Sequence, residues 1–105
     1  MVDITLIYGT DLPVKSALIA WTQFLELTGV HSTVVGELIE LGWLSPQQTR
    51  DEQYLFRSRD EYRVRKLDRL CADLDISLTG GSIIVDLLER IDTLEKRVRD
   101  LERLV

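Results

Sequence analysis

Apolar residues recur along this 105-residue chain at spacings that predict a mainly helical protein with little sheet. Residues 3–8 are rich in β-branched and aromatic side chains and precede a glycine and proline turn, so a short strand is expected there. Thr22 is the expected N-cap of a short helix that ends at Gly29, and Ser32 that of a second helix that ends at Gly42. Two short helices separated by a glycine turn predict a helix-turn-helix unit.

The stretch from residue 43 to residue 56 has apolar residues at both ends and a polar, turn-rich middle. Trp43 and Leu44 begin it, and Tyr54 and Leu55 stand near its end. This pattern predicts a wing, in which two short strands are joined by a loop.

Two longer helices are expected to complete the chain. Ser58 and Glu61 form a capping box, which predicts a third helix that runs to about Asp75. Residues 78–81 contain two glycines and are expected to break it, so that a last helix begins at about Ser82. Apolar residues of this last helix alternate between steps of three and four, as in the heptad seam of a coiled coil. The seam consists of Ile84, Leu87, Ile91, Leu94, Val98, Leu101 and Val105.

An exposed apolar seam predicts a homodimer, with the seam from Ile84 to Leu101 as its interface. If the seam occupies heptad positions a and d, Arg90 and Arg97 fall at position g, and Glu95 and Glu102 fall at position e. Opposite charges then face each other in a parallel pair and like charges in an antiparallel pair. Each such ion pair is worth only about 0.5 kcal/mol, so the charges alone leave the orientation open.

The net charge of −5 belongs entirely to the amino-terminal half of the chain. Residues 1–56 hold two basic and seven acidic residues, whereas residues 57–105 hold eleven of each. An acidic module disfavours binding to a phosphate backbone and suits a basic protein partner. The residues expected to bind such a partner, chosen by charge and expected exposure, are Glu26, Glu37, Glu40, Asp51 and Glu52.

Catalytic and cofactor chemistry finds little support in the sequence. Cys71 is the only cysteine and His31 the only histidine, which excludes an intrachain disulfide and leaves too few soft ligands for structural zinc. Residues 9–16 approach a phosphate-binding loop, but Val14 stands where a second glycine is needed and Pro13 lacks an N–H donor. We therefore expect no enzymatic activity and no cofactor.

The sequence also carries no sign of export or membrane insertion. The first twenty residues lack the charge pattern of a signal peptide, and no apolar run approaches the roughly 18 residues of a membrane span. A cytoplasmic protein without membrane contact is expected.

A basic cluster at the start of the third predicted helix provides the alternative of a nucleic-acid surface. Its candidate contacts are Arg57, Arg59, Arg63 and Lys66. Asp60, Glu61 and Asp68 are interleaved with them, which favours a solvated, salt-bridged helix face instead.

The order of the predicted elements resembles that of the MerR-like winged-helix proteins. The sequence Gly-Trp-Leu-Ser-Pro at residues 42–46 is similar to the Gly-Leu-Leu-x-Pro motif with which their wing begins. Together, the predicted elements give a mainly α fold with a MerR-like winged helix-turn-helix. They are an N-terminal strand and extension in residues 1–20, a winged helix-turn-helix in 21–57, and a third helix and C-terminal coiled-coil helix in 58–105, expected to form one compact domain. The recognition helix departs from the family, because residues 35–37 lack the arginine and aromatics of its DNA-binding members.

A closer resemblance is to the chaperone-modulator CbpM family, a MerR-like offshoot. It rests on residues 38–42, 67–70 and 73–74, and above all on Leu-Thr-Gly-Gly at 78–81 running into residues 84–91. It covers residues from about 22 to 98 and leaves residues 1–20 unexplained. This resemblance implies an adaptor that binds the J domain of a DnaJ-like or CbpA-like co-chaperone and keeps it from engaging DnaK. J domains of that kind present a basic helix, for which an acidic competitor is suited.

Two main hypotheses follow from the sequence. One is a J-domain-binding chaperone modulator, and the other is a MerR-like regulator that binds DNA as a dimer. A coiled-coil protein with some other partner stays open as a third.

Overall fold

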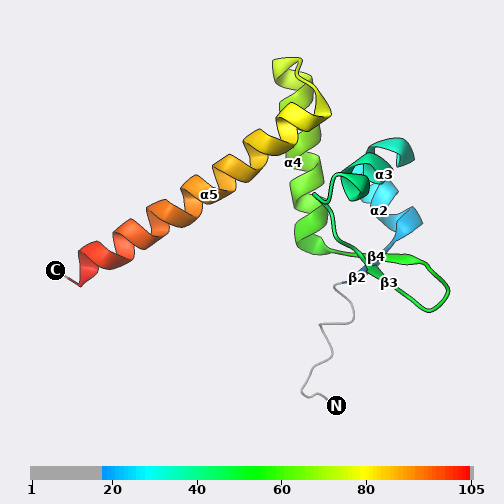
Figure 1. Ribbon diagram of the computed structural model, residues 1–105, viewed down its shortest axis with the longest axis horizontal. Coiled ribbons are helices and arrows are strands. Elements are labelled where there is room, and N and C mark those ends of the chain that lie inside the picture. Colours follow the sequence, from blue (N-terminus) through cyan, green and yellow to red (C-terminus); the bar gives the residue numbers. More distant parts are fainter. Residues whose placement is uncertain (1–17, 105) are drawn as a thin grey trace, which may run out of the picture. The chain divides into compact units, whose positions relative to one another are not determined.

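The computed structural model describes residues 18–104 (Figure 1). The expected strand at residues 3–8, the loop at residues 9–16 and Val105 lie outside the described residues. The described residues divide into two compact units, with the boundary between Arg65 and Lys66. Within the described residues the fold is mainly α with a small three-stranded sheet, as the sequence predicts.

The predicted helix-turn-helix consists of α2 (Trp21–Thr28) and α3 (Ser32–Glu40). Gly29 ends α2 with φ 73°, a left-handed conformation that glycine adopts without strain. The predicted N-caps are both wrong by one or two residues. Thr22 lies inside α2, which begins without a side-chain cap, and the cap of α3 is His31, whose Nδ1 accepts the Thr33 N–H at 3.1 Å.

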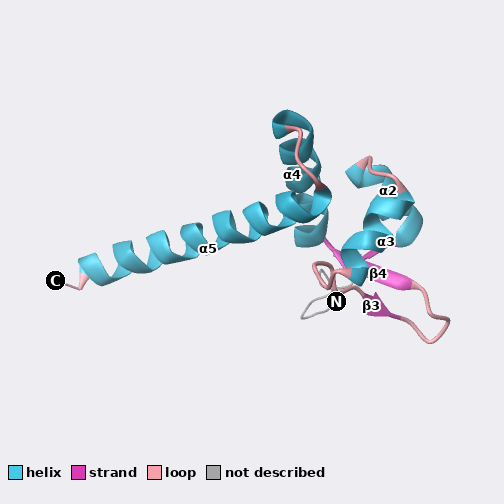
Figure 2. Ribbon diagram, turned by 45° about the horizontal axis from the view of Figure 1, so that its top comes forward, coloured by secondary structure: helices cyan, strands magenta, loops and turns pink. Residues whose placement is uncertain are grey.

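Three short antiparallel strands form the sheet, in the order β2 (Leu18–Ala20), β4 (Tyr54–Arg57), β3 (Gln47–Gln48). The pair β3 and β4 is labelled in Figure 2. Trp43 and Leu44, which begin the predicted wing, lie outside β3. Their N–H groups instead donate to the Leu38 carbonyl at 2.9 and 3.1 Å, which uses them to end α3. The strand forms later, on two exposed glutamines whose backbone pairs with β4.

The core of the first unit is aromatic where the sheet meets α2. Phe24 and Phe56 are fully buried and stack with their ring centroids 3.9 Å apart. Trp21 lies 5.9 Å from Tyr54 and 6.1 Å from Phe56, half-buried at the margin of this cluster. Val35, Leu38 and Leu44 are also buried, so the apolar face of α3 and the segment that follows it belong to the same core.

The third predicted helix is α4 (Ser58–Leu74), and Asp75, with φ 54°, stands just after its end. The predicted capping box of Ser58 and Glu61 is wrong by one residue. The Oδ2 of Asp60 accepts the Arg57 N–H at 3.0 Å, whereas Glu61 forms an ion pair with Arg65 at 3.2 Å. The cap thus lies one residue earlier in the chain than predicted.

The last helix is α5 (Leu78–Arg103), which begins four residues earlier than predicted. Ser77 is its N-cap, with its Oγ accepting the Gly80 N–H at 3.0 Å, so the two glycines lie inside the first turn and do not break the helix. Gly81 is buried there. A Cβ at Gly81 would lie 2.5 Å from the Sγ of Cys71 and 2.8 Å from a methyl of Leu67, so only glycine permits this approach of α5 to α4.

Candidate partner-binding surface

The exposed side of α3 forms an acidic face. Thr33, Glu37 and Glu40 are spaced by four and three residues, which places them on one side of the helix, and all three are exposed. The helix contains no lysine or arginine to balance the two carboxylates. We call Thr33, Glu37 and Glu40 the acidic face of α3.

Gly36 lies among these residues on α3. A Cβ built at this position would meet nothing within 4 Å, so the glycine is not required by contacts within the described residues. Glycine in a helix interior costs about 0.5–1 kcal/mol relative to alanine. Its small size leaves room for a partner to approach the backbone of α3 closely.

Hydrogen bonds hold α3 at both ends and thereby fix the position of the acidic face. At the amino end, the imidazole of His31 caps the helix, as described above. At the carboxyl end, the Leu41 N–H donates to the Glu37 carbonyl at 2.9 Å and the Gly42 N–H to the Ile39 carbonyl at 3.0 Å. Gly42 adopts φ 76°, the left-handed conformation that lets the chain turn away from the helix.

Leu41 is an apolar residue that the sequence pattern misplaced. Its spacing from Leu38 assigns it to the buried face, yet it is 51% exposed, because α3 ends at Glu40 and the chain turns at Gly42. Directly after Glu40, it adds an exposed apolar side chain beside the acidic face. An apolar contact surrounded by charged groups is a common arrangement in protein interfaces.

The other acidic candidates lie on different elements, and all are exposed. Glu26 belongs to α2, whereas Asp51 and Glu52 are in the loop that projects beyond β3 and β4 (Figure 1). That loop is tied by Thr49, whose carbonyl accepts the Glu52 N–H at 2.9 Å and whose hydroxyl accepts the Gln53 N–H at 3.1 Å. The five predicted residues therefore lie on α2, on α3 and in the wing loop. Of the five, α3 brings Glu37 and Glu40 together.

The basic candidates for nucleic-acid binding are partly engaged within the protein. The guanidinium of Arg63 lies 4.0 Å from the ring centroid of Trp43 and donates to the Trp43 carbonyl at 3.3 Å. This contact between positions 20 residues apart could not be read from the sequence. Arg57 and Arg59 are exposed at the junction of β4 and α4, and Lys66 is half-buried.

Chemistry of other kinds is sparse in the described part of the chain. Cys71 is half-buried, and its pKa is raised from 9.0, first by burial and then by the negative charge of Asp68, which makes the thiol less reactive. Between residues 18 and 104, no three histidine, cysteine, aspartate or glutamate side chains gather as a metal site would require. No helix in that range has the length and apolar content needed to cross a membrane.

Comparison with known proteins places this chain in a family. Residues 19–103 match the family described as MerR HTH family regulatory protein, and the chain belongs to that family. Within it the chain is CbpM-like, as its sequence motifs indicate. It is 30% identical over 89 residues to the chaperone modulatory protein CbpM of Coxiella burnetii strains Dugway 5J108-111, RSA 331 / Henzerling II and CbuG_Q212, and each alignment covers 85% of this chain and 84% of the relative.

Proposed function

We propose that this protein is a chaperone modulator that binds the J domain of a DnaJ-like or CbpA-like co-chaperone and inhibits its engagement of DnaK. The observation that carries the proposal is the acidic face of α3, an exposed helix surface with two carboxylates and no basic residue. The curated relatives named above are called chaperone modulatory proteins, which agrees with a role of this kind.

The position of the acidic face supports protein binding over DNA reading. In a helix-turn-helix protein, the second helix is the one that enters the major groove, where it reads base edges. Here α3 presents Glu37 and Glu40 on that helix, and these carboxylates would repel the phosphates on either side of a groove. A basic helix of a J domain reverses this interaction, because each carboxylate can accept charge-assisted hydrogen bonds from lysine or arginine.

Leu41 and Gly36 supply the uncharged part of the proposed interface. Leu41 offers an exposed apolar contact directly after Glu40, and Gly36 lets the partner approach the helix backbone. Charges at the margin of an interface mainly raise the association rate, whereas a buried apolar contact mainly slows dissociation. The two kinds of residue therefore have separate kinetic effects.

The proposal is tested by reversing the charge of α3. The variant Glu37→Lys with Glu40→Lys should bind the J domain with an association rate at least tenfold lower at low salt. The wild-type rate should itself fall as salt rises. Association is measured on a biosensor with an immobilised J domain from the same cell, and circular dichroism checks that the variant is folded.

A matched control reverses two exposed carboxylates of α5 instead. Asp92→Lys with Asp100→Lys changes the net charge by the same amount, and its side chains are 61% and 70% exposed. It should associate at nearly the wild-type rate. If both double variants slow association equally, net charge is responsible and the placement of the site is wrong; if the wild-type protein binds no J domain, the proposed function is wrong.

DNA binding is the second candidate, because the matched family consists of helix-turn-helix regulatory proteins and Arg57 and Arg59 are exposed. We expect no tight complex with duplex DNA near physiological salt, since the winged unit is acidic. A gel shift with the promoter of its own gene tests this. A specific complex that is lost in Arg57→Ala with Arg59→Ala would favour the second candidate.

A further inference from the structure

The turn between α2 and α3 places the chain's only histidine at the amino end of the helix that carries the acidic face. The Thr33 backbone N–H donates to His31 Nδ1 at 3.1 Å, and the Thr33 Oγ1 lies 3.0 Å from the same ring nitrogen. A backbone N–H can only donate, so Nδ1 must accept, and the proton of the neutral ring is then on Nε2. The cap therefore requires an uncharged imidazole in one tautomer.

We infer that His31 is a pH-sensitive cap, which holds the first turn of α3 while the ring is neutral and releases it when the ring is protonated. A proton on Nδ1 removes the acceptor of the Thr33 N–H. The charged ring also stands at the positive end of the helix dipole, where a cation is unfavourable. Serine, asparagine and aspartate, which are common N-caps, keep an acceptor oxygen at every pH between about 5 and 8.

Protonation of His31 also changes the acidic face of α3, because Thr33 belongs to that face and contacts the imidazole. A basic partner helix would then meet a positive charge on the same helix as Glu37 and Glu40, and a first turn that has lost a hydrogen bond. Acid should therefore weaken partner binding. This consequence for binding rests on the proposed function, whereas the cap itself does not.

The charged groups around this turn separate the imidazole from other causes of a pH response. Both polar contacts of the His31 ring within the described residues are with Thr33. The two helices that the turn joins carry three acidic residues, Glu26 on α2 and Glu37 and Glu40 on α3, and in residues 18–104 none forms an ion pair with His31. Carboxylates as a class titrate near pH 4, whereas histidine is the side-chain type that changes charge between about pH 5 and 8. A response in that range that disappears when His31 is replaced therefore belongs to the imidazole.

Thermal unfolding at pH 7.5 and at about pH 5.5 tests the cap without any partner. Because the neutral ring is the one that caps, its contribution is present above the range in which histidine titrates and is lost as the pH falls through that range. The wild-type midpoint should fall by about 4 °C or more beyond that of His31→Asn, which keeps a capping oxygen at both pH values. NMR of the ring nitrogens should show the proton of the neutral ring on Nε2.

The biosensor with the immobilised J domain tests the effect on the acidic face. Between pH 7.5 and about pH 5.5, the dissociation constant of the wild type should rise roughly threefold or more beyond that of His31→Asn. The J domain is the same in both measurements, so its own titration cancels in the comparison.

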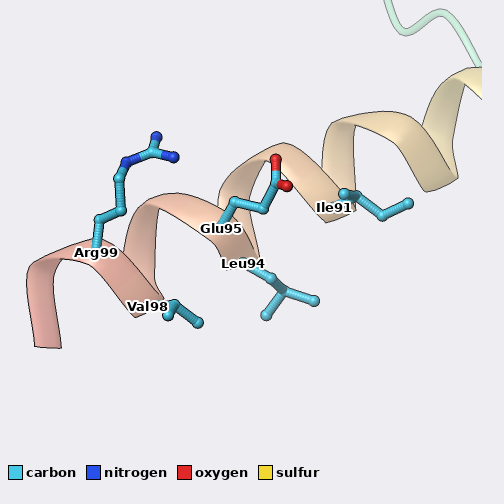
Figure 3. Close-up of a pocket in the computed structure, with 5 residues that line it drawn as sticks. All are labelled: Ile91, Leu94, Glu95, Val98 and Arg99. Atoms are coloured by element: carbon cyan, nitrogen blue, oxygen red, sulfur yellow. The ribbon is translucent and has the colours of Figure 1, made fainter. Parts of the chain in front are cut away.

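A matched control moves the imidazole from the start of α3 to α5. Arg99 is exposed, and Figure 3 shows its side chain on the opposite side of α5 from Leu94 and Val98. His31→Asn with Arg99→His keeps one histidine in the chain but none at the cap. Its unfolding midpoint and its binding should respond to acid as those of His31→Asn do.

Three results would overturn the inference. They are equal acid responses of the wild type and His31→Asn, a wild-type response in the control variant, and a neutral ring with its proton on Nδ1. If the wild type binds no J domain at either pH, the proposed function is wrong, and the unfolding midpoints still decide whether His31 is a pH-sensitive cap.

Discussion

Gly81 is the residue whose size the packing of α5 restricts most. Gly81→Ala should lower the free energy of unfolding by about 1–3 kcal/mol, because the added Cβ would overlap Cys71 and Leu67. Gly80→Ala is the matched control. Its Cβ would meet only Ser77 Oγ at 3.2 Å, so its effect should be smaller or even stabilising. Urea unfolding followed by circular dichroism measures both variants, and equal midpoints would contradict this account of the contact between α4 and α5.

Cys71 should react slowly with alkylating reagents. Burial raises the pKa of its thiol from 9.0, the charge of Asp68 raises it further, and the thiol donates to the Ser77 carbonyl at 3.5 Å. Because a raised pKa leaves less thiolate at pH 8, iodoacetamide should react more slowly than with a free thiol, and the rate should still rise above pH 9. Mass spectrometry follows the reaction. Asp68→Asn should increase the rate modestly, and a free-thiol rate in the wild type would contradict the prediction.

Gly36 lies inside α3, and the space that a Cβ at this position would enter is open. Gly36→Ala should raise the free energy of unfolding by about 0.5–1 kcal/mol, because its Cβ enters open space and alanine favours the helix. Gly36→Trp should remain folded but weaken J-domain binding by roughly tenfold or more, since a large side chain at a close contact excludes the partner. Thermal unfolding and biosensor affinity measure the pair. Unchanged affinity of the folded Gly36→Trp protein would place the interface elsewhere.

Helical periodicity predicts the number and type of the helices well, because each apolar face is a local pattern. It fails at the ends of the helices, because single hydrogen bonds there determine which residue is the cap. His31 replaces Ser32 as the cap of α3, and Asp60 takes the role expected of Glu61 in α4. The start of α5 is missed because two glycines usually end a helix, whereas here Gly81 provides room for Cys71. The wing pattern does not locate β3, because its glutamines form a strand only through pairing with β4.

The candidate surface is predictable in part. Charge counting selects Glu37 and Glu40 correctly as exposed residues, and a spacing of three residues suffices to place them together on a helix. The wing pattern places Asp51 and Glu52 in a loop between two strands, where the structure has them. Neither of these patterns can find the exposure of Leu41 or the contact of Arg63 with Trp43, because both depend on how the chain folds after α3.

The acidic face of α3 and the predicted dimer seam of α5 belong to different units of the chain. The acidic face lies in the unit that ends at residue 65, and the seam lies in the unit that begins at residue 66. Recognition of a partner and pairing with a second copy can therefore be tested by separate variants.

We propose that the acidic face of α3 binds a J domain and thereby keeps it from DnaK. The most direct measurement is the ATPase activity of DnaK, stimulated by its J protein, as this protein is added in increasing amounts. Wild-type protein should abolish the stimulation and leave basal ATPase activity unchanged, whereas folded Glu37→Lys with Glu40→Lys should need at least tenfold more protein for half inhibition. Stimulation that persists at saturating wild-type protein, or inhibition that the double variant retains in full, would contradict the account.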